Sequence, residues 1–198
     1  LGGMSLWKKL TRTQWIILFI LAAGFIGAAG VLPVFFASVI AFVPAFFYLK
    51  SIRSSEEKDA EPWETIWVAF AWGGLSGVFL AIILNTIGTV FILGVLYGTS
   101  EVDDLERMSI FIGAVIVAPI VEEFVKPLVM LRNAQVKKEI DEVEDGIVYG
   151  AACGLGFGAT ENVLYGLSPE ALAAGVAGIF FIVVLRTFSS ILLHLVAS

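Results

Sequence analysis

The fold class is indicated most clearly by one stretch of sequence, Met108-SIFIGAVIVAPIVEEFVKPLVM-Leu131. It is long and apolar enough to span a membrane and yet carries ionisable side chains. These side chains are Glu122, Glu123 and Lys126. An ionised group near the centre of a bilayer costs about 2.5–3.5 kcal/mol even on the most lenient scale. We therefore expect them to face a protein interior or a water-filled cavity, where such groups mark functional sites by default.

The composition extends this conclusion to the whole chain. Its 198 residues are 59% hydrophobic and only 15% charged, and the mean hydropathy is +0.94. A soluble domain carries about 25% charged residues, so this chain is expected to be a membrane protein. The net charge of −6 argues against nucleic acid as a partner. The single cysteine, Cys153, excludes a disulfide within the chain.

We expect a single all-α integral membrane domain, a polytopic transmembrane helical bundle, over residues 1–198. The first three residues, Leu1-Gly2-Gly3, are expected to be a vector remnant ahead of Met4, and the natural protein is expected to continue after residue 198.

Apolar runs separated by polar loops predict about six membrane-spanning segments. They are roughly Gln14–Leu32, Pro33–Leu49, Ile66–Tyr97, Met108–Leu131, Gly146–Leu167 and a last run from Ala171 to the chain end. Gly30 and Pro33 are expected to form the break between the first two. The third is interpreted as one helix that is tilted or broken near Asn85-Thr86.

The distribution of loop cations predicts the orientation. With six spans, almost all of them lie on the side of the N-terminus: Lys8, Lys9, Arg12, Lys50, Arg53, Lys58, Arg132, Lys137 and Lys138. Only Arg107 lies on the other side, and the remaining two cations, Lys126 and Arg186, are intramembrane. By the positive-inside rule, the N-terminus is expected to be cytoplasmic.

The two adjacent glutamates are not expected to share one role. Neighbours on a helix point about 100° apart, and Lys126 is within reach of both Glu122 and Glu123. One glutamate would form an ion pair with Lys126 and the other would remain for chemistry. Pro119 removes a backbone donor upstream, which favours a kink that admits water.

A second acidic site is expected on the glycine-rich segment Asp145-GIVYGAACGLGFGATENVLYG-Leu167. Glycines every four residues allow another helix to approach closely, and Glu161 projects on the same face, with Phe157 beside it. Asp145 is expected to cap this helix. Asn162 would serve the site or a neighbouring helix.

The last apolar segment carries a polar stripe that includes the only histidine. Arg186, Ser190, His194 and Ser198 follow at four-residue steps, with Thr187 close by. Near neutral pH, histidine takes a proton, donates a hydrogen bond or binds a metal. His194 meets the two acidic sites at one depth only if Ala171–Gly178 is a surface or re-entrant piece, or if the fourth span starts deeper than drawn.

Each of these residues also has a purely structural interpretation. Lys126 with a glutamate, or Arg186 with Glu161, would then be a packing ion pair, and His194 a packing hydrogen-bond partner. Two acidic sites and the sole histidine on three successive spans favour a joint site instead.

Two rival functions use the same residues. One is a proton- or cation-coupled membrane transporter, although the halves of the chain show no internal repeat. The other is a non-catalytic binder of a partner helix.

Three motifs, in order, resemble the PrsW family of intramembrane proteases, distant relatives of the CAAX prenyl-endopeptidase and bacteriocin-processing proteins. Glu122-Glu123-Phe124-Val125-Lys126 matches the Glu-Glu-x-x-Lys motif, Phe157-GAT-Glu161-Asn162 matches the second motif, and His194 matches the third. The resemblance runs from about Glu61 to the chain end.

The resemblance implies peptide-bond hydrolysis in or near the membrane, with Glu122, Glu123, Glu161 and His194 as catalytic residues supported by Lys126, Phe157, Asn162 and Arg186. In one mechanism, Glu122 activates a water and His194 or Asn162 stabilises the oxyanion. In the other, glutamates and His194 hold a divalent metal such as zinc, with Glu122, Glu161 and His194 as the ligands. We favour the first, because the chain has no second histidine and a site with one histidine and only carboxylates is unusual for catalytic zinc. The CAAX relatives have a histidine where Glu161 stands, so their residue roles do not transfer directly.

The resemblance also indicates the setting. The expected substrate is a membrane protein, such as a membrane-tethered anti-sigma-factor-like regulator, recognised through its transmembrane or juxtamembrane segment. The expected location is the cytoplasmic membrane of a prokaryote, with the lipid bilayer as a partner. The oligomeric state and the cleavage site stay open.

Overall fold

The described chain is built from helices. The computed structural model describes residues 10–55, 60–98 and 104–197, and these contain no β-strand, which confirms the all-α prediction. In chain order the elements are α1 (Arg12–Ala29), α2 (Val31–Ser55), α3 (Trp63–Ala71), η2 (Trp72–Gly77), α4 (Val78–Tyr97), α5 (Leu105–Phe111), η3 (Ile112–Val117), α6 (Ala118–Val125), α7 (Leu128–Arg132), α8 (Ala134–Glu139), α9 (Val143–Gly166), α10 (Pro169–Ala173) and α11 (Gly175–Ala197).

Within the described residues, four helical stretches are long and apolar enough to cross a membrane. They are Arg12–Ala29, Val31–Ser55, Trp63–Tyr97 and Leu105–Arg132. The apolar part of α11, Gly175–Ser190, is shorter. Their outer faces carry exposed large apolar side chains such as Phe19, Phe91 and Phe188, as expected for helices that meet lipid.

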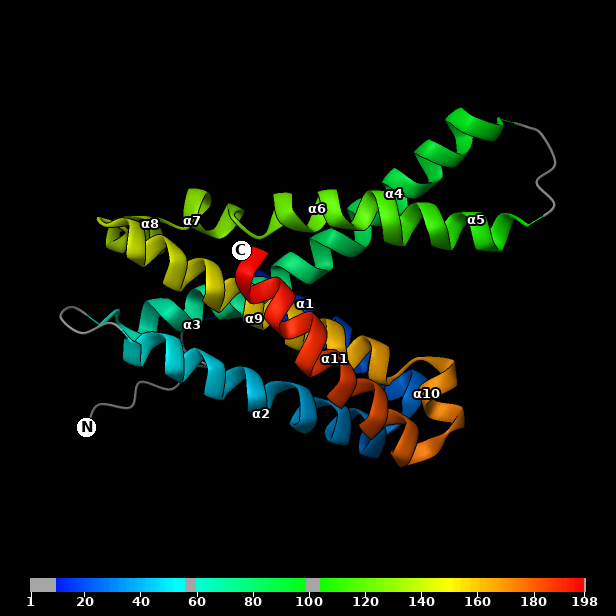
Figure 1. Ribbon diagram of the computed structural model, residues 1–198, viewed down its shortest axis with the longest axis horizontal. Coiled ribbons are helices and arrows are strands. Elements are labelled where there is room, and N and C mark those ends of the chain that lie inside the picture. The colour runs from blue at the N-terminus through cyan, green and yellow to red at the C-terminus, as the bar shows by residue number, and fades with distance from the viewer. Residues whose placement is uncertain (1–9, 56–59, 99–103, 198) are drawn as a thin grey trace.

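Helix α9 occupies the centre of the bundle, where it packs against α2, α3, η2 and α11 (Figure 1). All its residues from Val148 to Thr160 are buried. Because this part of α9 faces protein rather than lipid, its glycines and its carboxylate at Glu161 are tolerated. Helices α4 and α5 extend away from the bundle to one side (Figure 1).

Small residues set the closest helix contacts. A methyl group at Gly156 would lie 2.0 Å from the carbonyl oxygen of Phe70, and one at Gly73 would lie 1.9 Å from that of Cys153. Backbone therefore meets backbone where α3 and η2 cross α9. Gly146, which belongs to the predicted glycine face, has open space instead.

The first two apolar helices are joined by a single glycine. Gly30 adopts a φ of 86°, a conformation that favours glycine, and its N–H donates to the carbonyl of Ile26. Helix α2 begins at Val31, so Pro33 lies in its first turn and the predicted break is real but sits at Gly30 alone.

The third predicted span is one continuous helical stretch, Trp63–Tyr97, as expected. Of the two alternatives, tilted or broken near Asn85-Thr86, the break is wrong, because α4 runs through these residues without interruption. The irregular segment lies earlier, where η2 forms a wide π-helical turn around Gly73, Gly74 and Gly77. These glycines are buried against α9, so packing on α9 rather than local sequence places the irregularity.

The start of α9 also differs from the prediction. The N-cap is Glu142, and Asp145 is the third residue of the helix. The Asp145 carboxylate accepts from the backbone N–H groups of Asp141 (3.0 Å) and Glu142 (2.8 Å), so it caps the helix from inside its first turn.

Candidate active site

Two of the predicted site residues divide their roles on α6 as the sequence suggested. Lys126 is almost fully buried and donates to Glu123 at 2.5 Å, while the Glu123 side chain is 44% exposed. Glu122 is partly buried on a different face of the helix. Glu123 is thus the glutamate in the ion pair, and Glu122 is the one left for the interior.

Pro119 lies inside the helical stretch Leu105–Arg132, as the sequence predicts, at the point where the π-helical turn η3 passes into α6. The helix then stops at Lys126, which is followed by Pro127. The thiol of Cys153 on α9 donates to the carbonyl of Lys126 at 3.3 Å and so holds this break against α9.

Lys126 has a second partner that the sequence did not reveal, the imidazole of His194 on α11. The Lys126 ammonium lies 2.9 Å from Nδ1 of His194, and Nε2 of His194 lies 2.9 Å from Oε2 of Glu161. An ammonium only donates, so Nδ1 accepts and Nε2 carries the proton that is donated to Glu161. Lys126 thereby fixes the tautomer of the ring.

The aromatic and small residues beside His194 define its pocket. The Phe157 ring lies 5.3 Å from the His194 ring and 5.4 Å from the Lys126 ammonium, measured to the Phe157 ring centre. A methyl group at Gly158 would lie 3.0 Å from Cδ2 of His194. Gly158 therefore leaves the room that the imidazole needs.

Arg186 ties Glu161 to Asn162. One guanidinium nitrogen, Nη2, donates to Oε2 of Glu161 at 3.0 Å and to Ser190 at 3.3 Å, and Nε donates to Oδ1 of Asn162 at 3.0 Å. Because Arg186 only donates, the amide of Asn162 turns its oxygen towards Arg186. Its Nδ2 is buried and has no hydrogen-bond partner among the described residues.

The remaining predicted residues are placed as follows. Thr187 is buried, and its hydroxyl donates to the carbonyl of Val183, so it takes no part in the cluster. Ser198 lies outside the described residues. The last segment contains a short helix, α10, before α11, and α11 begins at Gly175, four residues earlier than the start near Ile179 that a separate piece Ala171–Gly178 would give.

Three helices together bring Glu122, Glu161 and His194 to one point. One ligand atom from each of these side chains lies within 4.8 Å of the others. The oxygens and the nitrogen face a common space between α6, α9 and α11. Such a space suits either a water molecule or a metal ion.

The donor set itself fits a divalent metal, since carboxylate oxygens and imidazole nitrogen are ordinary zinc ligands. The surroundings of His194 fit less simply. A metal-bound histidine normally directs its second ring N–H at an acceptor, whereas here Nδ1 faces the ammonium of Lys126. A metal on Nε2 would place a proton on Nδ1, and Lys126 would then have to turn fully towards Glu123.

The sequence analysis missed Tyr165, which lies one helical turn beyond Glu161. The guanidinium of Arg186 stacks on its ring, 3.6 Å from the ring centre, and the phenol is close enough to feel the charges of both Glu161 and Glu122. The four-residue step from Glu161 was a signal that could have identified it.

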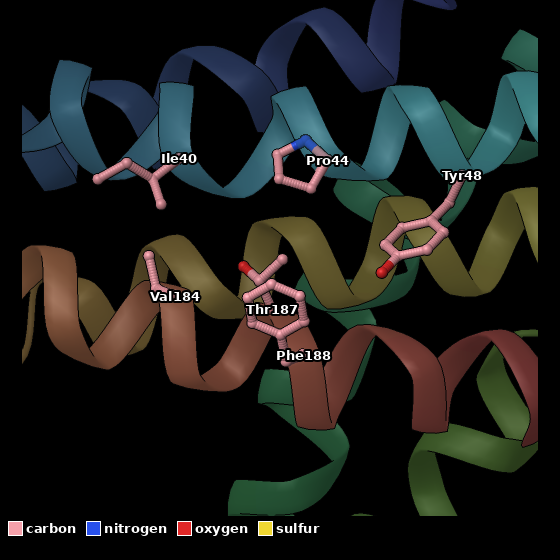
Figure 2. Close-up of a pocket in the computed structure, with 6 residues that line it drawn as sticks. All are labelled: Ile40, Pro44, Tyr48, Val184, Thr187 and Phe188. Atoms are coloured by element: carbon pink, nitrogen blue, oxygen red, sulfur yellow. The ribbon is translucent and has the colours of Figure 1, made fainter.

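A cavity of about 230 Å³ between α2 and α11 lies apart from this cluster (Figure 2). Its lining is almost wholly apolar and consists of Ile40, Pro44, Tyr48, Val184, Thr187 and Phe188. None of the three converging side chains lines it, so it supplies no chemistry to the site.

Comparison with known proteins points to one family. The family model described as PrsW family intramembrane metalloprotease matches residues 61–198. Two curated proteins, each named Protease PrsW, are similar. The one from Oceanobacillus iheyensis is 32% identical over 89 residues, which is 44% of this chain and 41% of that protein. The one from Geobacillus kaustophilus is 34% identical over 121 residues, which is 61% of this chain and 45% of that protein.

The chain thus spans less than half the length of these relatives. No solved structure matches. The family match covers more than half of the chain and contains all three motifs, so the resemblance is confirmed: this chain belongs to the PrsW family of intramembrane proteases.

Proposed function

We propose that this chain carries the catalytic centre of an intramembrane endopeptidase that hydrolyses a peptide bond in or near a transmembrane segment of a membrane-tethered substrate. The observation that carries this proposal is the convergence of Glu122, Glu161 and His194 from three helices. A buried ion pair would need only two of these groups. Three side chains whose oxygen and nitrogen atoms face one common space can instead hold a reactant between them.

In this proposal, Glu122 is the general base. Its carboxylate takes a proton from a water molecule while the water oxygen adds to the scissile carbonyl carbon, and the carbonyl electrons move to oxygen. When this oxyanion collapses, the C–N bond breaks and Glu122 returns the proton to the leaving nitrogen. The products are a carboxylic acid and a free amine. Glu122 suits this role because, among the described residues, no ion pair or hydrogen bond ties it to a cation, whereas Glu123 is held by Lys126.

The other groups of the cluster orient the centre. Lys126 holds His194 so that its Nε2–H points at the space shared with Glu161, where it stabilises the oxyanion. Asn162 is the alternative donor, but its side chain is fully buried. Arg186 balances the negative charge of Glu161.

A divalent metal would be held by Glu122, Glu161 and His194. When bound, it would supply Lewis-acid polarisation of the carbonyl and a more acidic water. The position of Lys126 at Nδ1 of His194 favours the glutamate-activated water.

The membrane arrangement in this proposal has about six spans with a cytoplasmic N-terminus, in the cytoplasmic membrane of a prokaryote. Four of these spans are the long apolar helical stretches, and the other two are α9 and α11. Helices α9 and α11 must cross the membrane too, because the site needs Glu161 and His194 at the same membrane depth as Glu122. The substrate class, an anti-sigma-factor-like regulator, comes from the family resemblance.

Coupled transport of protons or cations is the second candidate. The continuous contacts from Lys126 through His194 to Glu161 and Arg186 form a path of proton-bearing groups across three helices. Such paths occur in transporters.

The experiment is cleavage of a tagged single-pass protein in liposomes by wild-type protein, Glu122→Gln and the control Glu170→Gln, which changes an exposed glutamate on α10. We expect cleavage by wild type and Glu170→Gln but not by Glu122→Gln. Proton flux in the same liposomes without cleavage would favour transport instead.

A further inference from the structure

We infer that Tyr165 is a further catalytic residue, whose phenolic hydroxyl donates a hydrogen bond to the carbonyl oxygen of the scissile peptide bond. This inference rests on the proposed function. It assigns a role to a residue outside the three motifs.

The position of Tyr165 is fixed relative to the catalytic carboxylates. It follows Glu161 by one turn of α9, so the two side chains lie on the same face. The neighbouring Leu164 and Val121 of α6 pack against the same buried cluster of Val78, Ala81 and Phe157, so this end of α9 and the helix that carries Glu122 share a core. Both carboxylates lie within electrostatic range of the phenol.

Arg186 holds the ring in place. Its guanidinium carbon lies 3.6 Å from the centre of the Tyr165 ring, and the same guanidinium donates to Glu161 and Asn162. A guanidinium on the face of an aromatic ring is attracted by the ring's quadrupole. One cation therefore locks the tyrosine ring and the Glu161 carboxylate into a single rigid unit.

The donors of His194 and Lys126 are already committed, whereas Nδ2 of Asn162 has no partner among the described residues but is buried. His194 uses Nδ1 for Lys126 and Nε2 for Glu161, and the Lys126 ammonium is 1% exposed and bound to Glu123. Asn162 is 0% exposed. An oxyanion forming between Glu122 and Glu161 thus needs a donor that substrate can reach, beyond the proton that His194 shares with Glu161.

Tyr165 meets this need. It is 45% exposed, so a substrate can reach it, unlike the buried donors of the cluster. Its hydroxyl makes no hydrogen bond to any residue in the described ranges 10–55, 60–98 and 104–197, so it is available to a substrate. A neutral phenol is a donor that adds no charge to the site.

The test compares Tyr165→Phe with wild type in the liposome cleavage assay. Phenylalanine keeps the ring and its stacking with Arg186 but removes the hydroxyl. We expect kcat to fall about 10²-fold, as for loss of one oxyanion donor, with KM within about twofold. Tyr48→Phe, which removes a phenol from the distant α2–α11 cavity, is the matched control and is expected to cleave like wild type.

The possible outcomes distinguish a failure of the Tyr165 assignment from a failure of the proposed protease function. If wild type cleaves and Tyr165→Phe cleaves equally fast, Tyr165 is only a packing partner of Arg186 and the inference is overturned. If Tyr165→Phe lowers affinity without lowering kcat, the hydroxyl binds substrate but does not act in the transition state, which also overturns it. If folded wild type cleaves nothing, the proposed function fails and takes this inference with it.

Discussion

At the scale of single residues, the two neighbouring glutamates have different environments and should have different importance. Glu123 is 44% exposed and tied to Lys126, whereas Glu122 faces Glu161 and His194. We expect Glu122→Gln to lower kcat more than 10³-fold, while Glu123→Gln lowers it less than about 10-fold, because glutamine still accepts a hydrogen bond from Lys126. Rates of substrate cleavage in liposomes measure this. Equal losses in the two variants would assign both glutamates to the chemistry.

A single contact, between Lys126 and His194, also distinguishes activation of water by glutamate from activation by a metal. Since Lys126 donates to Nδ1 of His194, the account expects a chelator to change the cleavage rate by less than about twofold. Elemental analysis of the purified protein, before and after dialysis against the chelator, is the accompanying measurement. Loss of activity that follows loss of a bound metal, with recovery on adding zinc, would show the metal mechanism instead.

At this scale, the sequence singled out residues that are anomalous in their surroundings, and the structure brings them together in one cluster. Glu122, Lys126, Glu161 and His194 were identified because charges and a lone histidine are costly among apolar residues. The contact between Lys126 and His194 was not identified, because these residues lie 68 positions apart and only the tertiary fold brings them together. Tyr165 was missed because a tyrosine in a membrane helix is not unusual.

At the scale of elements, α9 depends on close backbone contact with α3. A methyl group at Gly156 would meet the carbonyl oxygen of Phe70 at 2.0 Å, whereas one at Gly146 would meet nothing. We expect Gly156→Ala to lower the free energy of unfolding by about 1–3 kcal/mol. Gly146→Ala, on the same helix, is expected to raise it by up to about 1 kcal/mol. Unfolding in detergent micelles measures both, and a Gly156→Ala protein as stable as wild type would contradict this packing.

Elements were predictable where local sequence determines them. The helical hairpin at Gly30 follows from a glycine between two apolar runs, and the structure places a positive φ there. The π-helical turns η2 and η3 were not predictable, because they depend on how helices fit together. The N-cap of α9 was misplaced by three residues, from Glu142 to Asp145, because both carboxylates take part in capping.

At the scale of the whole molecule, the arrangement in the membrane is open to a direct test. The proposed topology places Ser55, at the end of α2, in the cytoplasm and Asp104, before α5, outside. Both residues are exposed, and the native Cys153 is fully buried. We expect a membrane-impermeant maleimide to label Asp104→Cys in intact cells, and Ser55→Cys only after permeabilisation. The reverse pattern would invert the topology, and unchanged protein serves as the unlabelled control.

The central claim is that three helices combine to form one hydrolytic centre. The most direct measurement is single-turnover cleavage of a membrane-embedded substrate by Glu122→Gln, Glu161→Gln and His194→Ala, each shown to be folded by its unfolding transition. The account predicts that each change lowers the rate at least about 10²-fold, because each removes one member of the centre. Cleavage at the wild-type rate by any one of these variants would contradict the claim for that residue's helix.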